Sequence, residues 1–277
     1  MREVVPETSW PESWVYSYKY DREEVFGTPS NWGYALAYRN RRQETLKLVT
    51  EAIKPGATVL DLAAAQGNFT LALAELGYRV TWNDLRADLA GYVRKKYERG
   101  EVGYVAGNAF ELNLADGFDC VLFCEVIEHV AHPDEFMANI ARLVKPGGVA
   151  VMTTPNGRYF RNTLPRFSDY PDPSVFETTQ FKPDSDGHIF LLWPDEIRRF
   201  AKRSGLVVER QLFFSTPLTN GHMKTHHLLR FMPHSLVWMI ERAAQRLPAA
   251  AQECLMVQTA ARFRKVVESC EARITMS

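Results

Sequence analysis

Two glutamates and a histidine near the middle of the chain have a spacing that could support chemistry. Glu125, Glu128 and His129 stand at positions i, i+3 and i+4 of the segment CEVIEHVAHPDEF, so they share one face if that segment is helical. Together they could form a general base with carboxylates that orient it, or three ligands for a divalent cation. They could also be a solvated, self-paired helix start. Because they directly follow the apolar run FDCVLF of residues 118–123, a predicted buried strand, we favour a functional group.

A second informative stretch is TVLDLAAAQGNF, at residues 58–69. Its pattern predicts a buried strand that turns through small residues into a helix over residues 69–76. Small residues let a ligand approach the backbone, and the helix N-terminus offers unpaired N–H groups and a partial positive charge. Asp61, near the end of this strand, could face a cationic ligand. A plain nucleotide-binding strand–turn–helix is the alternative interpretation.

An acidic residue follows the next predicted strand, residues 78–82. In a doubly wound sheet the ligand lies beyond the carboxyl ends of the strands. Asp84 stands about 20 residues past the first turn, where one carboxylate can accept hydrogen bonds from two ribose hydroxyls. Leu85 would then pack on an adenine ring. Alternatively, Asp84 only caps a helix over residues 87–99.

Composition limits the classes of protein to consider. The chain has 277 residues, 46% of them hydrophobic, which predicts one large domain or one domain with embellishments. Lys plus Arg and Asp plus Glu both number 33, and this balance argues against a surface that tracks nucleic acid. The N-terminal sequence MREVVPETSW lacks an apolar signal core, and no run of 18 apolar residues occurs, so we expect a cytoplasmic protein.

The cysteines support this compartment. Cys120, Cys124, Cys254 and Cys270 include no CxxC pair, so neither a zinc knuckle nor a disulfide framework is indicated, and a reducing environment fits.

The second half of the chain identifies a family. A helix over residues 132–144, a KPGG turn at 145–148 and a fifth strand at 149–153 follow EVIEHV, and TTPN closes the series. With the first acidic motif and Asp84, this series resembles the class I S-adenosylmethionine (SAM) dependent methyltransferases over about residues 45–215. The resemblance implies an α/β fold with a Rossmann-like, mainly parallel seven-stranded sheet of order 3-2-1-4-5-7-6 and helices on both faces. It also implies that the chain, residues 1–277, is a single methyltransferase domain.

The resemblance also implies the cofactor contacts. In such methyltransferases the turn after the third strand holds the adenine, and here that strand is residues 102–105. Asn108 replaces the more usual aspartate and its carbonyl can accept from the amino group, while Phe110 could stack. The expected cofactor-binding residues are Asp61, Ala63, Ala65, Gly67, Asp84, Leu85, Asn108, Ala109, Phe110 and Cys124.

The first motif departs from the family. Ala63 and Ala65 stand where glycines are usual, and only Gly67 is kept. Alanine can replace glycine where φ is negative, at the cost of space beside the ligand. These alanines permit the alternative of a SAM-binding protein without turnover, although the acidic and histidine cluster argues against it.

A narrower resemblance involves a metal ion. ExxEH after the fourth strand, TTPN after the fifth and a histidine before the next helix are similar to the ubiquinone-biosynthesis O-methyltransferases and the small-RNA 3′-terminal 2′-O-methyltransferases. The resemblance implies that Mg²⁺ or another divalent cation is held by Glu125, Glu128, His129 and His188. Without metal, His129 is the expected base, oriented by Glu128 or Glu125. The two roles exclude each other, because a ligated nitrogen cannot take the proton.

Segments outside this core carry further expectations. Residues 1–34 are rich in aromatics and prolines, which predicts an irregular arm with short helical turns, either a lid over a pocket or an aromatic anchor. A helix is expected over residues 34–53. It carries Arg39, Arg41 and Arg42, one of which could meet the carboxylate of SAM, although a solvated helix face is the preferred interpretation.

The remaining segments follow the fifth strand. Residues 157–187 are long, proline-rich and aromatic, so we expect a substrate loop over the methyl-transfer site. A helix is expected at 194–204, a strand at 207–214 and a last, antiparallel strand at 253–260. Between these strands lies an insertion, residues 216–252, whose segment 228–248 is basic and amphipathic. That segment could contact a membrane surface, a lipid-linked substrate or a partner subunit. We favour a helix that packs on the domain and partly closes the acceptor pocket.

The predicted reaction is O-methylation of a small-molecule hydroxyl on a sugar, phenol or natural product. An RNA 2′-O-methyltransferase is the main rival, against which stand the balanced charge and the lack of a recognisable RNA-binding module. An N- or C-methyltransferase is a further alternative.

Overall fold

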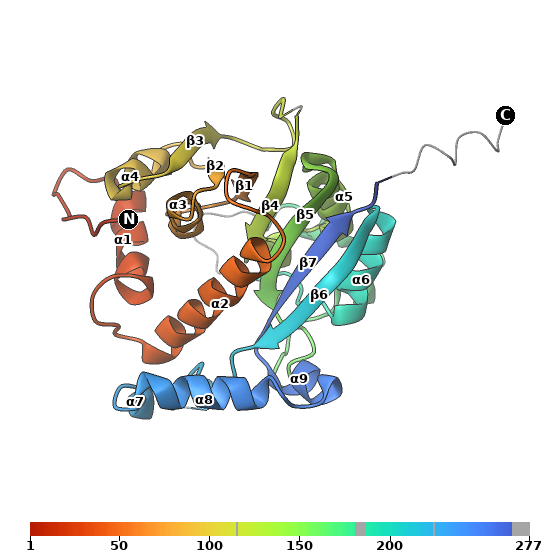
Figure 1. The fold of residues 1–277 in the computed structure, drawn as a ribbon. Helices are drawn as coiled ribbons and strands as arrows, with labels where there is room; N and C mark the ends of the chain where they lie inside the picture. The colour runs from red at the N-terminus through yellow and green to blue at the C-terminus, as the bar shows by residue number, and fades with distance from the viewer. Residues whose placement is uncertain (115, 181–186, 224, 268–277) are drawn as a thin grey trace.

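The protein is built on one seven-stranded sheet, seen in a computed structural model that describes residues 1–114, 116–180, 187–223 and 225–267 (Figure 1). The strand order is β3-β2-β1-β4-β5-β7-β6, as expected, and β7 runs antiparallel to both of its neighbours. Cys270 and residues 181–186 of the expected substrate loop lie outside the described residues. The strands are β1 (Thr58–Leu62), β2 (Arg79–Asp84), β3 (Glu101–Ala106), β4 (Phe118–Cys124), β5 (Val144–Pro155), β6 (Leu206–Phe214) and β7 (Gln258–Lys265).

Helices cover both faces because the central strands are apolar on both sides. Val59 packs in the cluster beneath α2 and α3, whereas the next residue, Leu60, packs in the cluster beneath α5 and α6. The helices of the first face are α2 (Trp32–Thr50), α3 (Asn68–Glu75) and α4 (Leu89–Lys96). Those of the second face are α5 (Pro133–Leu143) and α6 (Pro194–Arg203).

The N-terminal arm is more regular than predicted. It forms a helix, α1 (Glu12–Glu24), so the expectation of irregular structure with short turns is wrong. Trp10 packs edge-on against Trp14, Tyr18 and Tyr92, with ring centroids 5.7–5.9 Å apart. Because Tyr92 belongs to α4, these aromatic contacts tie the arm to the domain and stabilise a helix whose own apolar pattern is weak.

A buried ion pair also joins α1 to α4. Lys96 Nζ lies 2.7 Å from the carboxylate of Asp21, and both side chains are fully buried. Tyr92 Oη donates to the same carboxylate at 2.7 Å, and Lys96 donates to the Asn68 side chain at 2.6 Å. Since all these polar groups are hydrogen-bonded to one another, the position of α1 is specified in detail.

The last strand begins later than predicted. Residues 253–255, expected to begin the last strand, complete α9 (Ala249–Leu255), and β7 starts at Gln258. Pro248 precedes α9 and three alanines open it, so helix propensity carries the helix through the apolar residues that had suggested a strand.

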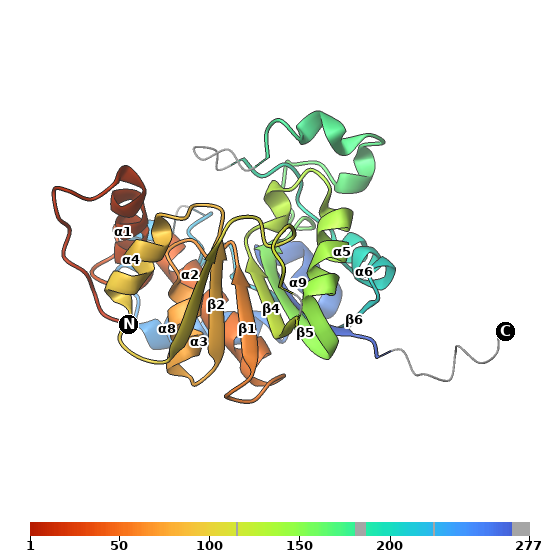
Figure 2. The same cartoon turned by 90° about the horizontal axis from the view of Figure 1, so that it is seen from above.

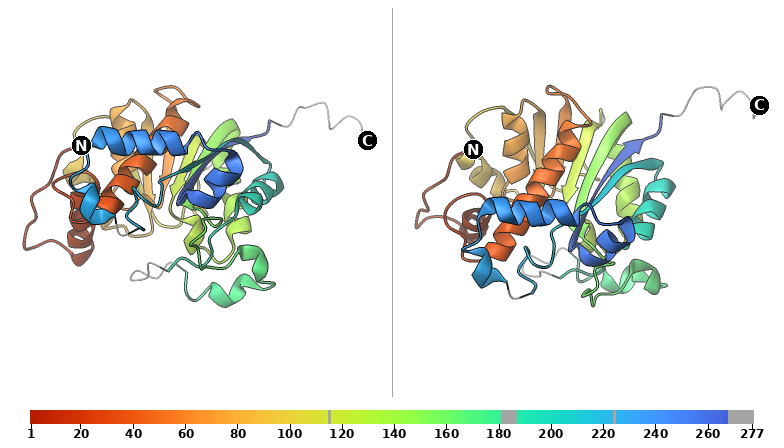
Figure 3. Two further views of the ribbon diagram at one scale, coloured as in Figure 1. Left: turned by 90° about the horizontal axis from the view of Figure 1, so that it is seen from below. Right: turned by 60° about the horizontal axis from the view of Figure 1, so that its bottom comes forward.

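The described part of the 216–252 segment carries helices that pack beside α2 (Figure 3). It contains α7 (His226–Leu229) and α8 (His234–Ala244), whose residues Leu229 and Val237 pack against Leu36. The buried carboxylate of Glu241 accepts hydrogen bonds from Asn40 at 2.9 Å and from the Ser215 N–H at 3.0 Å. Within the described residues, each helix is too short or too polar to cross a bilayer.

The Asp21–Lys96 pair should contribute strongly to stability. We expect Lys96→Met to lower the free energy of unfolding by about 3–5 kcal/mol, because it leaves a buried carboxylate without its cation. The neighbouring Lys95→Met is the matched control, since Lys95 pairs with Glu7 in an exposed position and should change stability by less than about 1 kcal/mol. Urea unfolding measures both, and equal effects would contradict the assignment.

Candidate functional site

A cavity of about 700 Å³ lies at the carboxyl ends of β1, β2, β3 and β4. Its floor is the turn after β1, and its walls come from the turns after the other three strands. Residues of α1 and α2 close one side of it. Asp61, Ala63, Ala65, Asp84, Leu85, Asn108, Ala109, Phe110 and Cys124, all expected to contact the cofactor, line this cavity.

The alanines of the first turn adopt an unusual backbone. Ala63 and Ala65 have φ values of 53° and 45°, so the expectation that alanine is tolerated there through a negative φ is wrong. Both are in the left-handed region, which costs a residue with a Cβ about 1–2 kcal/mol. Gly67, with φ 72°, caps α3, and a Cβ there would lie 2.7 Å from a methyl of Val93. Ala63 and Ala65 therefore adopt the left-handed conformation that favours glycine, the residue that is usual at these positions in the family.

Two aspartates face the cavity from β1 and β2. Asp61 is buried and accepts a hydrogen bond from Thr70 Oγ1 at 2.5 Å, and burial raises its pKa to about 7. Asp84 accepts from the Ala65 N–H at 2.9 Å and from Arg86 Nε at 3.0 Å. The Arg86 N–H and Arg86 Nη2 donate to Asp84 as well, at 2.9 Å and 3.3 Å, so a ligand hydroxyl would take the place of the half-exposed Arg86 side chain on this carboxylate.

The turn after β3 is arranged by its own side chains. Asn108 Oδ1 accepts from the Phe110 N–H at 3.1 Å, and Asn108 Nδ2 donates to Glu111 at 2.7 Å. The rings of Phe110 and Phe136 form a T-shaped pair with centroids 5.3 Å apart. Leu85 lies at the cavity rim, 58% exposed.

The ExxEH segment is not the helix whose single face was expected to hold all three side chains. Only Ile127–His129 form a short 3-10 helix, and Glu125 precedes it with φ 54°. This backbone directs the Glu125 side chain away from the Glu128, His129 and His188 group. The Glu125 carboxylate lies 2.8 Å from Arg41 Nη1 and accepts a hydrogen bond from Thr153 Oγ1 at 2.9 Å.

Three of the four expected metal ligands converge. Candidate ligand atoms of Glu128, His129 and His188 all lie within 4.8 Å of one another, and Glu125 is outside this group. Glu128 is fully buried; Thr154 donates to its Oε2 at 3.0 Å, and its Oε1 has no partner. Burial and the nearby Glu125 charge raise the pKa of Glu128 well above its ordinary value. A buried carboxylate oxygen without a donor, beside two imidazoles, fits a divalent cation.

The orientation of His129 supports the same use. Its Nδ1 lies 3.2 Å from the Gly187 carbonyl oxygen, which can only accept, so Nδ1 carries the proton. Nε2 then has a lone pair available, either for a metal ion or for a proton.

Sequence reasoning missed Glu24 and Tyr38 in the cavity wall and gave Arg41 a cofactor contact only as the less favoured alternative. Glu24, Tyr38 and Arg41 line the cavity, and the Tyr38 hydroxyl and Arg41 Nε are buried without partners. The preferred interpretation of a solvated face is therefore wrong for Arg41, whose side chain is 13% exposed. A signal existed in the spacing of Tyr34, Tyr38 and Arg41 along one face of α2.

The segments expected to cover the acceptor side contribute little to this cavity. The described part of the 157–187 loop projects beyond α5 in Figure 2 and supplies only Gln180 to the lining. His132 at the rim contacts Glu177 of that loop at 2.7 Å. No described residue of 216–252 lines the cavity, so a role for α8 in closing it finds no support.

Comparison with known proteins gives a consistent result. Residues 35–211 match the family model described as a methyltransferase domain. A ubiquinone biosynthesis O-methyltransferase from Caulobacter vibrioides is 40% identical over 106 residues, covering 36% of this chain and 42% of that protein. One from Rhizobium leguminosarum bv. trifolii is 29% identical over 195 residues, covering 69% of this chain and 73% of that protein. The first relatives are thus matched over roughly half of their length.

Solved structures share the fold at low identity. Magnesium protoporphyrin IX methyltransferase from Synechocystis, with bound S-adenosylhomocysteine, gives a TM-score of 0.55 at 14% identity and covers 89% of this chain and 93% of its own. Phosphoethanolamine N-methyltransferase 2 from Haemonchus contortus, in complex with SAM, gives 0.54 at 19% identity and covers 95% of this chain and 60% of its own. These likenesses confirm the Rossmann-like fold.

At Ala65 of the strained turn, substitution by glycine should stabilise the protein, although glycine usually lowers the free energy of unfolding. We expect Ala65→Gly to raise the free energy of unfolding by about 0.5–1 kcal/mol, because relief of the left-handed strain exceeds the added entropy of the unfolded chain. Ala64→Gly, in the same turn but without a positive φ, should lower it by about 0.5–1 kcal/mol. Thermal or urea unfolding of both variants decides, and destabilisation by both would refute the strain.

Proposed function

Because the chain belongs to the methyltransferase-domain family, we propose that it transfers the methyl group of SAM to a hydroxyl of a small molecule, assisted by a divalent cation. The observation that carries the proposal is the group of Glu128 and His129, which follow β4, with His188, which precedes α6. His129 lines the cavity, and Glu128 has a buried carboxylate oxygen without a partner. A group of this kind has no role in holding the cofactor, but it suits a reaction in which a hydroxyl must lose its proton.

The cavity residues fit the parts of SAM. Asp84 would accept the ribose hydroxyls, and the turn with Asn108 and Phe110 would hold the adenine. The methionine end would lie over the strained turn at Ala63 and Ala65, near Asp61. Its carboxylate would meet Arg41 and the Tyr38 hydroxyl, whose buried Nε and Oη lack partners. Each assignment pairs a charged or polar part of the ligand with a group that can satisfy it.

The protein's main task in this reaction is alignment. The sulfonium carbon of SAM is electrophilic already, so the acceptor oxygen must be held in line with the C–S bond at about 3 Å. When bound, a divalent cation would lower the pKa of the acceptor hydroxyl and orient it. Glu128, His129 and His188 would hold that cation, whereas Glu125 keeps its carboxylate on Arg41 and Thr153.

His129 has an alternative role if no metal binds. Its Nε2 is the available nitrogen, and it would take the acceptor proton while Gly187 holds Nδ1–H. Glu128 lies beside it and would stabilise the imidazolium that results.

The acceptor we propose carries neighbouring hydroxyls, as on a catechol or a sugar, since two oxygens bind one divalent cation better than one. The relatives from Caulobacter and Rhizobium are named for ubiquinone biosynthesis, and that from Renibacterium salmoninarum is a demethylmenaquinone methyltransferase. These names favour a phenolic ring as the acceptor.

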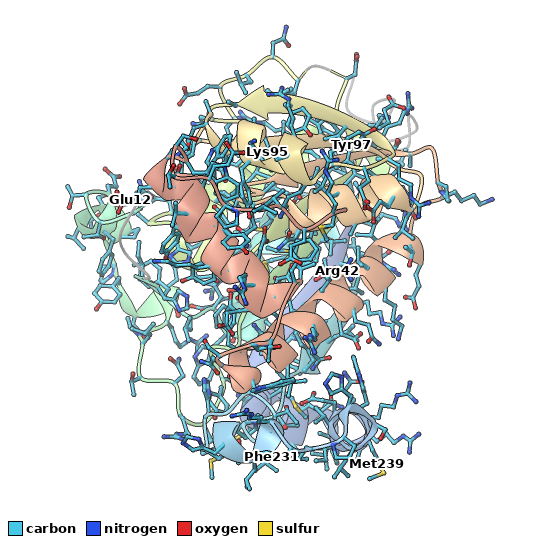
Figure 4. All side chains as sticks on the ribbon, turned by 90° about the vertical axis from the view of Figure 1, so that its left-hand side faces the viewer. Glu12, Arg42, Lys95, Tyr97, Phe231 and Met239 are labelled. Atoms are coloured by element: carbon cyan, nitrogen blue, oxygen red, sulfur yellow. The ribbon has the colours of Figure 1, made fainter. Side chains whose placement is uncertain are left out.

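The outer face of the 216–252 segment suits a peripheral contact with an anionic membrane surface. Leu228, Phe231 and Met239 are 65%, 80% and 60% exposed. Figure 4 shows Phe231 and Met239 at the outer edge of this helical layer. Exposed Arg230, Arg242 and Arg246 lie in the same segment, whose single acidic residue, Glu241, is buried. Apolar side chains among cations, with no exposed carboxylate, are what interfacial helices present to lipid.

Metal binding tests the central proposal. We expect wild-type protein to bind Mg²⁺, Mn²⁺ or Zn²⁺ in calorimetric titrations, and His188→Ala to weaken that binding by roughly 100-fold, because it loses a ligand. SAM binding should be unchanged. His234→Ala, which alters an exposed histidine of α8, is the matched control. If no cation binds to wild type, metal assistance is excluded and the His129 base remains.

Vesicle sedimentation tests the membrane contact. We expect wild type to bind phosphatidylglycerol-containing vesicles more tightly than neutral ones and to lose affinity as salt rises. The double variant Phe231→Ser with Met239→Ser should bind about tenfold more weakly. Val207→Ser, at an exposed valine of β6, is the control. Equal binding by both variants would refute this face, and a dimer lost in the double variant would assign it to a second copy instead.

A further inference from the structure

The first helix completes the cofactor cavity through its last residue. Glu24 ends α1, lines the cavity and is only 5% exposed. Tyr34 Oη donates to its Oε1 at 2.6 Å. Gln66 Nε2 and Asn68 Nδ2 each donate to its Oε2 at 3.0 Å. Because Gln66 and Asn68 belong to the turn and the start of α3, Glu24 lies beside the strained turn where the methionine end of SAM would bind.

These partners form hydrogen bonds with the Glu24 carboxylate but do not neutralise its negative charge. All three donors are neutral groups: a phenol and two amides. The charge of Arg41 also acts on Glu24, but the Arg41 guanidinium forms its ion pair with Glu125, at 2.8 Å. A buried carboxylate of this kind attracts a positive ligand strongly, since the surrounding dielectric constant is low.

The cavity as a whole favours a cationic ligand. Among its described lining residues, carboxylates outnumber the guanidinium groups of Arg41 and Arg86. The carboxylates are those of Glu24, Asp61, Asp84, Glu125 and Glu135.

We propose that Glu24 is a cofactor-recognition residue that makes the cavity prefer cationic SAM over its product, S-adenosylhomocysteine. The two ligands differ by the methyl group and by the sulfonium charge. During transfer the methyl carbon bonds to the acceptor oxygen, the C–S electron pair stays on sulfur, and the acceptor proton leaves to the base. The sulfur becomes a neutral thioether, so the attraction to Glu24 falls at the moment when the product must leave.

The anchoring of α1 fixes the position of the Glu24 carboxylate. Asp21, one turn before Glu24, is paired with Lys96 of α4 in the interior. Asn68 donates to both Asp21, at 2.8 Å, and Glu24. The carboxylate of Glu24 therefore cannot swing into solvent without breaking a buried network, and it is pre-organised for a cation.

Proton linkage gives a second consequence. Burial raises the pKa of Glu24, and the same cause raises that of Asp61 to about 7. The titratable and charged groups that face Glu24 are Asp21 of α1, Tyr34, Tyr38 and Arg41 of α2, and Lys96 of α4. A bound sulfonium favours the ionised carboxylates, so SAM binding below about pH 7 should release protons, and binding of the neutral thioether should release fewer.

Calorimetry without an acceptor tests the proposal independently of the acceptor and the metal. Titrations with SAM and with S-adenosylhomocysteine, in two buffers of different ionisation enthalpy at pH 6.5, give both affinity and proton release. We expect Glu24→Gln to weaken SAM binding by roughly tenfold and S-adenosylhomocysteine binding by less than about threefold, and to reduce the protons released by SAM. Glu12→Gln removes the same charge from the exposed start of α1 and should change neither ligand.

Two results would overturn the proposal. Equal weakening of both ligands by Glu24→Gln would show that Glu24 only supports the fold of the cavity. Equal affinity and equal proton release for the two ligands in wild type would refute the charge preference, even if the variant failed to fold. Failure of wild type to bind SAM at all would instead contradict the assignment of the cofactor.

Discussion

The site depends on one topological constraint, the placement of β1 between β2 and β4. From β1 the sheet grows in one direction through β2 and β3 and in the other through β4 and β5. The loops that follow β1 and β4 therefore leave on opposite faces and open a crevice between them. Into this crevice the chain brings the turn with Ala63 and Ala65 from one side and Glu125 to His129 from the other. The remaining elements complete walls around an opening that the strand order creates.

The N-terminal helices turn that crevice into a selective cavity. Arg41 of α2 links to Glu125 after β4, and Glu24 of α1 links to Gln66 before α3. Both links are partly buried, and charges withdrawn from water stay ionised only with partners of suitable geometry. The cofactor end of the cavity is consequently defined by contacts between segments far apart in the sequence, whereas the metal end is defined by residues close to β4 and by His188.

The strands near the cavity and the acidic residues at their ends could be predicted from the sequence, because apolar runs and acidic strand ends carry local signals. The sheet order was implied by the resemblance to the SAM-dependent methyltransferases, and nine of the ten residues expected to bind the cofactor line the cavity. The sequence did not predict α1, whose helix depends on Trp10 and Tyr92 packing across some eighty residues of chain. It placed Glu125 with Glu128 because a regular helix was assumed, and a single positive φ separates them. The last strand was displaced for a similar reason, since the apolar residues at 254–256 fit a helix end as well as a strand.

The buried Asp21–Lys96 pair has a consequence for how the protein folds. Its partners are 75 residues apart, and Lys96 lies in the helix after β2. Formation of this contact requires closure of a long loop, so α1 can dock only after β1, β2 and their helices have assembled. During synthesis α1 would leave the ribosome before the elements against which it packs. The cavity would then be complete for cofactor binding only after α1 has docked, because docking places Glu24 in the cavity wall.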